Sequence, residues 1–208
     1  MLKYCNDNLL TVVPQGGNTS LVGGASAYSG EIILSLSRLN QIEKFDKNTG
    51  IITAGAGVVL QNLQNLASDS GFEFPVSLGS KGSCQIGGNV ATQAGGTLYF
   101  KHGSIRNHIR GLEVVLANGD VLNLQSSISK NNIGPNLKEL FIGSEGTLGI
   151  ITKVDLSCPR KDGNQEVIFL KVSGYKNVFD FINLAKSHFN HDLTALEFLD
   201  YYSYCGIE

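Results

Sequence analysis

Charged residues are scarce in this sequence, and their scarcity narrows the classes of protein to which the chain can belong. Asp, Glu, Lys and Arg make up 16% of the 208 residues, below the roughly 25% usual for soluble domains. The net charge is −2 and no run of Lys or Arg occurs, so nucleic acid is not an expected partner. No apolar run approaches the roughly 18 residues that a membrane-spanning helix needs, so we expect no membrane span.

Metal-binding and redox motifs of cysteine are also missing. The four cysteines form no CxxC pair, which argues against a zinc ribbon and against a redox dithiol. We expect four reduced thiols, most of them buried. His188 and His191 could share one face of a helix, but no third ligand lies nearby in the sequence. We therefore expect a solvated helix end there and assign no metal site.

Glycine is abundant, and much of it lies in three stretches. They read PQGGNTSLVGG (14–24), GSKGSCQIGGNVATQAGG (79–96) and GSEGTLGII (143–151). Glycine lets the backbone approach a ligand closely, and successive N–H groups can converge on an anion. The first stretch has no Lys or Arg, so dipoles would hold the anion there, which suits the diphosphate of a dinucleotide. It matches neither GxxxxGK[ST] nor GxGxxG within a βαβ unit, so a P-loop and a Rossmann fold are excluded.

The three stretches together indicate one long ligand. For any single loop, tight turns between strands would be a sufficient interpretation. Three loops of the same uncharged chemistry favour instead a polar ligand with a diphosphate in its middle, a description that FAD fits. We expect the second loop to be long and without secondary structure, a feature usually found in functional or disordered segments.

Hydrophobic patterns around these loops predict an α+β domain. A helix should run into a strand over 2–13, strands should occupy 31–37, 51–57 and 149–157, and a hairpin should span 112–124. Asn118-Gly119 predicts a two-residue type I′ turn in that hairpin. We expect helices over 59–71, closed by Gly71, and over 136–143.

The composition changes at 159–165, where Pro, basic residues, Gly and Asn predict a linker. A strand over 166–172, a helix over 175–188 and a strand over 193–199 would form a β-α-β unit. We expect residues 1–158 to form one domain and residues 159–208 to begin a second. Because strand and ligand loop follow the first residue so closely, and the β-α-β unit is incomplete, we expect the chain to be an internal part of a larger protein.

The three stretches resemble, in order and spacing, those of the FAD-linked oxidase family of the vanillyl-alcohol oxidase type, with a PCMH-type FAD domain. The D-2-hydroxyglutarate dehydrogenases are the most similar branch, and the D-lactate dehydrogenases and glycolate oxidase flavin subunits are alternatives. This resemblance implies the second part of that FAD domain, with an antiparallel or mixed sheet flanked by helices. A ferredoxin-like substrate domain would follow. It also implies hydride transfer from C2 of a D-2-hydroxy acid to flavin N5, giving 2-oxoglutarate from D-2-hydroxyglutarate.

The resemblance also implies which residues hold FAD. The first loop would wrap the pyrophosphate, the second would run along the diphosphate, ribityl chain and isoalloxazine, and the third would close the adenine and ribose side. The residues carried over are Pro14, Gln15, Gly16, Gly17, Asn18, Thr19, Ser20, Pro75, Leu78, Gly79, Ser83, Gly87, Gly88, Asn89, Thr92, Glu145, Gly149 and Ile151. Covalent members carry a His where this chain has Asn18, so we expect FAD to be bound non-covalently.

Two positions depart from the family pattern. Where relatives usually have RYG, this chain has Lys101-His102-Gly103, and Lys lacks the planar donor fork of Arg. Where relatives have GYDL, it has Gly134-Pro135-Asn136-Leu137, and proline removes a backbone donor.

No residue of this chain matches the family's catalytic or metal-binding motifs, so we assign no catalytic residue and no metal ligand. The resemblance implies a small 2-hydroxy acid as substrate, an electron-transfer flavoprotein as acceptor, a homodimer of the full-length enzyme and a mitochondrial location. Two other interpretations remain: a partial chain that binds flavin without catalysis, and a glycine-rich binding module without flavin.

Overall fold

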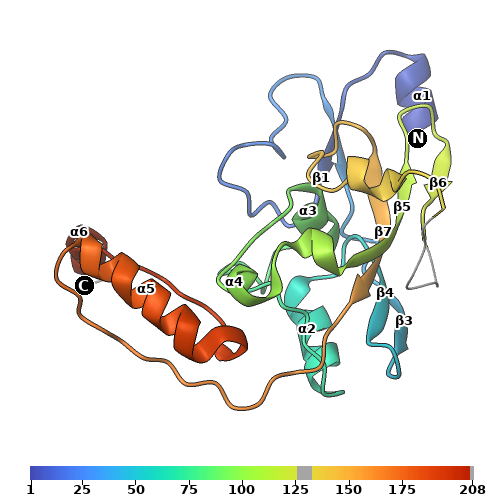
Figure 1. The fold of residues 1–208 in the computed structure, drawn as a ribbon. Coiled ribbons are helices and arrows are strands. Elements are labelled where there is room, and N and C mark those ends of the chain that lie inside the picture. The colour runs from blue at the N-terminus through green and yellow to red at the C-terminus, as the bar shows by residue number, and fades with distance from the viewer. Residues whose placement is uncertain (126–132, 207–208) are drawn as a thin grey trace.

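A five-stranded antiparallel sheet forms the centre of the computed structural model, which describes residues 1–125 and 133–206 (Figure 1). The strand order is β3-β4-β7-β5-β6. Its strands are β3 (Ile42–Asp46), β4 (Ile51–Gly55), β5 (Ile109–Val115), β6 (Val121–Asn123) and β7 (Ile150–Ser157). The central strand β7 follows directly on the third glycine loop, so the sheet fixes where that loop ends.

A second, two-stranded sheet carries the first glycine loop. Helix α1 (Leu2–Asp7) leads into β1 (Val12–Gln15), which pairs in parallel with β2 (Ile32–Ser35). The expected sequence of helix, strand and glycine loop is therefore confirmed. The loop lies between two paired strands, so both of its ends are held.

The hydrophobic core lies between the larger sheet and two helices, α2 (Leu60–Ser68) and α3 (Ile86–Ala91). Leu60, Leu63 and Ala67 of α2 are fully buried, as the helical spacing predicts. Ile86 and Val90 of α3 are fully buried as well. The core thus anchors α3, and with it the middle of the second glycine loop.

The second loop is not free of secondary structure, so that expectation is wrong. It contains α3 and is followed by the short helix α4 (Tyr99–His102). The adjacent Gly87 and Gly88 each disfavour a helix by about 1 kcal/mol relative to alanine. The sequence pattern therefore does not predict α3. Burial of Ile86 and Val90 one turn apart overrides that cost.

The hairpin of β5 and β6 is present, but its turn is not type I′. Only Gly119 has a positive φ, of 88°, whereas type I′ also requires one at Asn118. The backbone N–H of Gly119 donates to Leu116 O at 2.9 Å, and Leu116 N–H donates to Asp120 O at 2.9 Å. These bonds close a three-residue loop with glycine in the left-handed position. Strand β3, by contrast, had no counterpart among the expected elements.

The residues that the structure describes also include the 3-10 helices η1 (Ile105–His108), η2 (Leu137–Leu140) and η3 (Asn190–Asp192). The short helix expected over 136–143 is thus the 3-10 helix η2. All four cysteines are free, and Cys5, Cys84 and Cys158 are buried, as expected.

Beyond β7, the predicted β-α-β unit is only partly formed. The helix is present as α5 (Tyr175–Phe189), and a short helix α6 (Tyr201–Cys205) follows it. The segments 166–172 and 193–199 form no strands. Phe169 is 88% exposed, and neither segment pairs with another in the described parts of the chain. β-Propensity alone does not make a strand, because a strand needs a partner and a face to bury.

Candidate functional site

The first glycine loop folds back on itself through its own amide side chains. Gln15 Nε2 donates to Ala25 O at 2.6 Å, and Asn18 Nδ2 donates to Gln15 Oε1 at 3.3 Å. Together with Ser20, Gly23 and Ser26, these residues line a pocket of about 160 Å³. Thr19 lies between Asn18 and Ser20 in the same loop. The pocket is polar and has no charged side chain in its lining, as expected of a site that holds an anion by dipoles.

The first loop also lies directly against the second. A Cβ added to Gly17 would stand 2.1 Å from Ser83 O and 2.9 Å from Cys84 Cα, and one added to Gly16 would stand 3.5 Å from Gln85 Cβ. Only glycine at position 17 permits this approach, because the opposing atoms belong to backbone. The two loops predicted to share a ligand are therefore neighbours.

The second loop is attached to the core on one side and open on the other. Gly87 N–H donates to Ala56 O at 2.8 Å, and a Cβ on Gly87 would stand 2.5 Å from Ala56 Cβ. A Cβ added to Gly79, Gly82, Gly88 or Gly95 would meet nothing within 4 Å. The glycines thus divide into those that pack and those that face open space.

Two buried oxygen atoms, at the start of α3 and within it, have no hydrogen-bond partner within the described residues. They are Gln85 Oε1 and Asn89 Oδ1, and their residues are only 9% and 5% exposed. A buried acceptor without a donor costs about 1–3 kcal/mol. Each amide oxygen can therefore accept a hydrogen bond from a donor that reaches it.

The third loop joins the other two. Glu145 N–H donates to Ala91 O at 2.8 Å, which attaches the loop to the end of α3. Gly146, at φ 81°, would bring an added Cβ within 2.8 Å of Pro14 Cγ. A Cβ on Gly24 would lie 3.9 Å from Glu145 Oε2. All three glycine stretches therefore meet in one region.

A second pocket, of about 280 Å³, lies between the third loop, α1 and β1. Its lining includes Leu10, Val12, Pro14 and the backbone of Gly146 and Gly149. It is more apolar than the first pocket, and β1 contributes to both, Pro14 to this one and Gln15 to the first.

Backbone strain gathers in the same region. Within the described residues, five positions other than glycine have a positive φ. Three of them are Asn18 (51°), Gln93 (49°) and Glu145 (53°), one at each glycine stretch. Non-glycine residues in this conformation are uncommon and cluster at functional sites.

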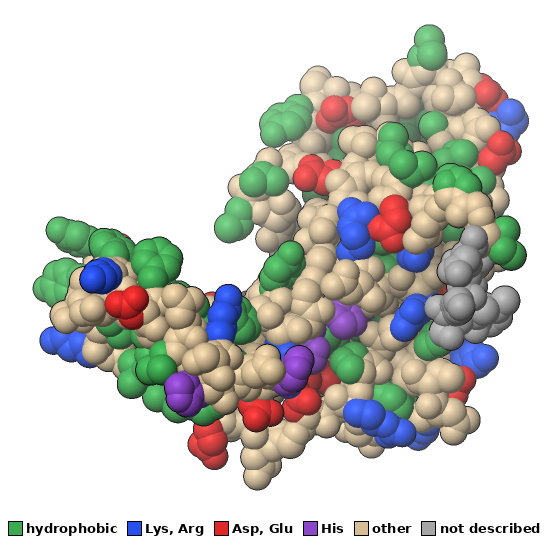
Figure 2. Space-filling view, viewed as in Figure 1, with side chains coloured by type: hydrophobic (Ala, Val, Ile, Leu, Met, Phe, Trp, Pro, Cys, Tyr) green, Lys and Arg blue, Asp and Glu red, His purple; other side chains and the backbone are tan. Residues whose placement is uncertain are grey.

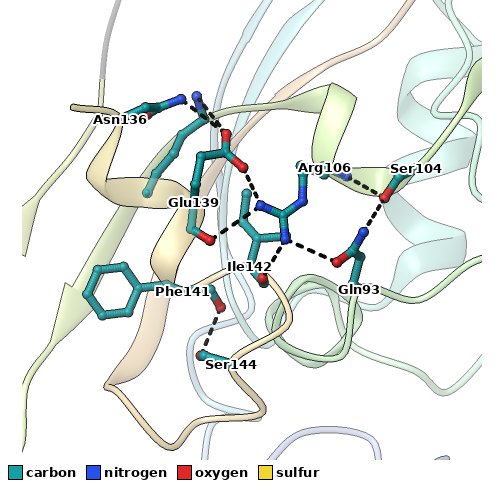
Figure 3. Close-up of polar contacts among 9 residues, drawn as sticks. Gln93, Ser104, Arg106, Asn136, Glu139, Phe141, Ile142 and Ser144 are labelled. Atoms are coloured by element: carbon teal, nitrogen blue, oxygen red, sulfur yellow. Dashed lines mark hydrogen bonds and ion pairs between the residues drawn. The ribbon is translucent and has the colours of Figure 1, made fainter. Parts of the chain in front are cut away.

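Arg106 connects the second loop to the third, a role that the sequence did not reveal. Its guanidinium pairs with Glu139 Oε2, and its Nη2 donates to Ile142 O at 2.9 Å and to Gln93 Oε1 at 3.1 Å (Figure 3). Gln93 Nε2 in turn donates to Ser104 Oγ at 2.9 Å. The spacing of these residues carries no motif, so only the tertiary structure brings them together.

Some of the predicted FAD-contacting residues face protein instead of open space. Ile151 is 4% exposed and belongs to the core cluster, and Pro75 is buried. A Cβ on Gly149 would lie 2.7 Å from Val114 Cγ1. Leu78 packs against the core cluster from a partly buried position. These residues could reach a ligand in the loops mainly through their backbone, whereas Thr92 is exposed and its Oγ1 donates to Gly88 O at 2.9 Å.

His108, the last residue of η1, packs edge-on against Phe74. Its Nδ1 is 3.3 Å from Ser157 O and its Nε2 is 3.1 Å from His102 O. Burial lowers the pKa of His108 below its ordinary 6.5, although the two carbonyl groups oppose that shift. Burial thus disfavours the charged form of this ring, where η1 meets the end of β7.

Comparisons with known proteins agree with this geometry. Residues 1–125 match the model of a family described as FAD binding domain. Zebrafish mitochondrial D-2-hydroxyglutarate dehydrogenase is 49% identical over 96% of this chain, and the match spans 38% of that protein. The D-2-hydroxyglutarate–pyruvate transhydrogenase of Saccharomyces cerevisiae is 40% identical, over 96% of this chain and 40% of that protein.

A solved structure, that of an alkyldihydroxyacetonephosphate synthase, superimposes with a TM-score of 0.66 at 25% identity. It covers 76% of this chain and 29% of that one. The chain therefore spans about two fifths or less of the length of these relatives. Within the described residues, no helix is long and apolar enough to cross a membrane.

Proposed function

Since this chain belongs to the FAD-binding domain family, we propose that its three glycine loops hold FAD non-covalently within an oxidoreductase that acts on a D-2-hydroxy acid. The observation that carries the proposal is the meeting of the loops, with Gly17 against Ser83 and Gly146 against Pro14. One extended ligand can touch all three only if they lie together.

The residues present fit the group. FAD carries a diphosphate, hydroxyl donors on its ribityl chain and an N–H donor on its ring. The polar pocket of Gln15, Asn18 and Ser20 suits the diphosphate, because uncharged donors and backbone N–H groups can hold an anion. The unpaired oxygens of Gln85 and Asn89 suit the donors of the cofactor.

The more apolar pocket beside Pro14 and Gly149 is the proposed place for the adenine. The backbone of the third loop and the Glu145 side chain would close the adenine side of the site. The open faces of Gly79 and Gly88 leave room for the ribityl chain and ring. We assign no catalytic acid or base to this chain. Asn18, whose amide is not a nucleophile, supports attachment without a covalent bond.

FAD, when bound, supplies the two-electron chemistry of such an enzyme, and the protein supplies position and electrostatics. The proposed substrate is D-2-hydroxyglutarate, with D-lactate and glycolate as alternatives, and the name of the zebrafish relative supports this order. The name of the zebrafish relative, which includes the word mitochondrial, also supports a mitochondrial location. An electron-transfer flavoprotein as acceptor and a homodimer of the full-length enzyme are further parts of the proposal.

We also propose that residues 1–158 form the FAD-binding unit and that residue 159 begins a substrate-binding unit. The break in regular structure after β7, followed by exposed apolar residues such as Val167 and Phe169, supports this boundary.

Flavin content provides the first test. The chain is purified, its flavin absorbance is recorded, and the measurement is repeated on protein and filtrate after denaturation. We expect bound flavin that passes entirely into the filtrate. Flavin retained on the polypeptide would contradict non-covalent binding, and a folded chain that takes up no added FAD would contradict the site.

The substrate is tested on the full-length gene product. We expect reduction of an artificial electron acceptor with D-2-hydroxyglutarate, and a lower rate with D-lactate and glycolate. Turnover of D-lactate alone would favour the first alternative. A flavin-loaded protein that oxidises none of the three acids would favour flavin binding without this catalysis.

A further inference from the structure

Three potential metal ligands from distant parts of the chain meet on the side of the molecule where the C-terminal segment leaves the sheet. They are Glu73, which follows α2, His102, the last residue of α4, and Asp162, which follows β7. One ligand atom from each lies within 4.8 Å of the others. Figure 2 shows histidine and acidic side chains side by side where that segment joins the body.

Backbone hydrogen bonds hold Glu73 and Asp162 as neighbours. Phe72 and Arg160 form an antiparallel bridge, and Glu73 N–H donates to Pro159 O at 2.9 Å. Lys161 N–H donates to Gly71 O at 3.1 Å. The two carboxylates are therefore brought together by main chain, not by flexible side chains alone.

His102 is held separately. Its N–H donates to Leu98 O at 3.0 Å within α4, and its carbonyl oxygen lies 3.1 Å from the ring of His108. The Nε2 atom of His102 is buried and has no hydrogen-bond partner among the described residues. A buried ring nitrogen without a partner is costly, and a cation would satisfy its lone pair.

A competing cation is already present. Lys101 Nζ lies 2.6 Å from Asp162 Oδ2, and the Lys101 side chain is 22% exposed. The Asp162 carboxylate thus already neutralises one positive charge, that of Lys101. Lys101 and a metal ion would compete for the same carboxylate.

We propose that Glu73, His102 and Asp162 form a divalent cation site of the zinc type. One imidazole and two carboxylates match the nitrogen and oxygen ligands that Zn²⁺ accepts, and water completes a four-coordinate site. With bonds of about 2.1 Å, ligand atoms in a tetrahedral site stand roughly 3.4 Å apart. Small side-chain rotations would close the 4.8 Å cluster to that size. The bound ion would link the segment after β7 to α4 and to Glu73.

Titration of the full chain with Zn²⁺ as the only probe tests the proposal. A C205S background removes the exposed thiol of Cys205. We expect one saturable equivalent of Zn²⁺, with affinity at least about tenfold lower in His102→Ala and in Asp162→Asn, since even indirect disturbance of a metal ligand costs about 10–100-fold. His191→Ala, which removes an exposed histidine outside the cluster, is the matched control and should bind as the background does.

Lys101→Gln distinguishes a metal site from a cluster that only stabilises the fold. Removing the ammonium group frees Asp162, so Zn²⁺ should bind more tightly in Lys101→Gln than in the background. Circular dichroism without metal checks that each variant is folded. The absence of saturable binding, or equal affinity in His102→Ala and in the background, would overturn the proposal.

Discussion

Replacing Gly88 with alanine separates the stability of the fold from the binding of FAD. Gly88 lies inside α3, and an added Cβ would meet no protein atom within 4 Å. Its φ is not positive, so alanine fits the backbone. Alanine is favoured over glycine in a helix by about 0.5–1 kcal/mol. For a chain of this size that corresponds to an increase in melting temperature of about 1–4 °C.

The same methyl group should weaken flavin binding. If FAD passes over α3, the new Cβ occupies space that the ligand uses, and overpacking costs about 1–3 kcal/mol. That range corresponds to a loss of about 5–150-fold in affinity. Gly88→Ala should therefore be more stable without ligand and bind FAD more weakly.

The assay combines thermal unfolding of the ligand-free protein with titration by FAD, followed through flavin fluorescence. Gly163→Ala is the control, because Gly163 lies outside the three loops and its added Cβ also meets nothing within 4 Å. It should leave the affinity for FAD unchanged, whatever its effect on the melting temperature. A Gly88→Ala protein that melts at a higher temperature yet binds FAD as tightly as the parent would refute the proposed path of the cofactor.

Three further predictions concern the supports of the site. Gly17→Ala puts a Cβ 2.1 Å from Ser83 O, so the first two loops should separate and FAD affinity should fall in the same titration; an unchanged affinity would show that their contact is dispensable. Arg106→Gln removes the pair with Glu139, whose side chain is 34% exposed, so denaturant unfolding should report a loss of only about 1 kcal/mol while FAD affinity falls. Because the folded-state pKa of His108 is lowered by burial, the unfolded state binds more protons below about pH 6.5, and the unfolding free energy should decrease as the pH falls through this range. His108→Gln should flatten that dependence, and an equally steep profile in the variant would assign it to other groups.

Much of the local structure could be predicted because it is encoded in neighbouring residues. The spacing of Leu60, Leu63 and Ala67 predicts α2, and the alternation around Asn118-Gly119 predicts the hairpin. The turn type within that hairpin was wrong, because Asn-Gly is compatible with more than one loop and the strand register selected the three-residue form.

The predictions for α3 and for the C-terminal segment 166–172 failed for opposite reasons. Gly87 and Gly88 suppress the helical signal, yet Gly87 is needed where α3 touches Ala56, and burial of its neighbours compensates. Residues 166–172 have strong β-propensity but pair with no strand in the described chain. In both cases the tertiary environment overrides the local preference.

The sequence by itself determined the chemistry of the site: three glycine-rich loops with few charged residues, suited to a long ligand with an internal diphosphate. Only the tertiary structure decided which glycines pack and which face open space, how Arg106 joins two of the loops, and that Glu73, His102 and Asp162 meet at all. The physical reason is that loop composition is a local property. The approach of one backbone to another depends on how the sheet and its helices bury residues far apart in the chain.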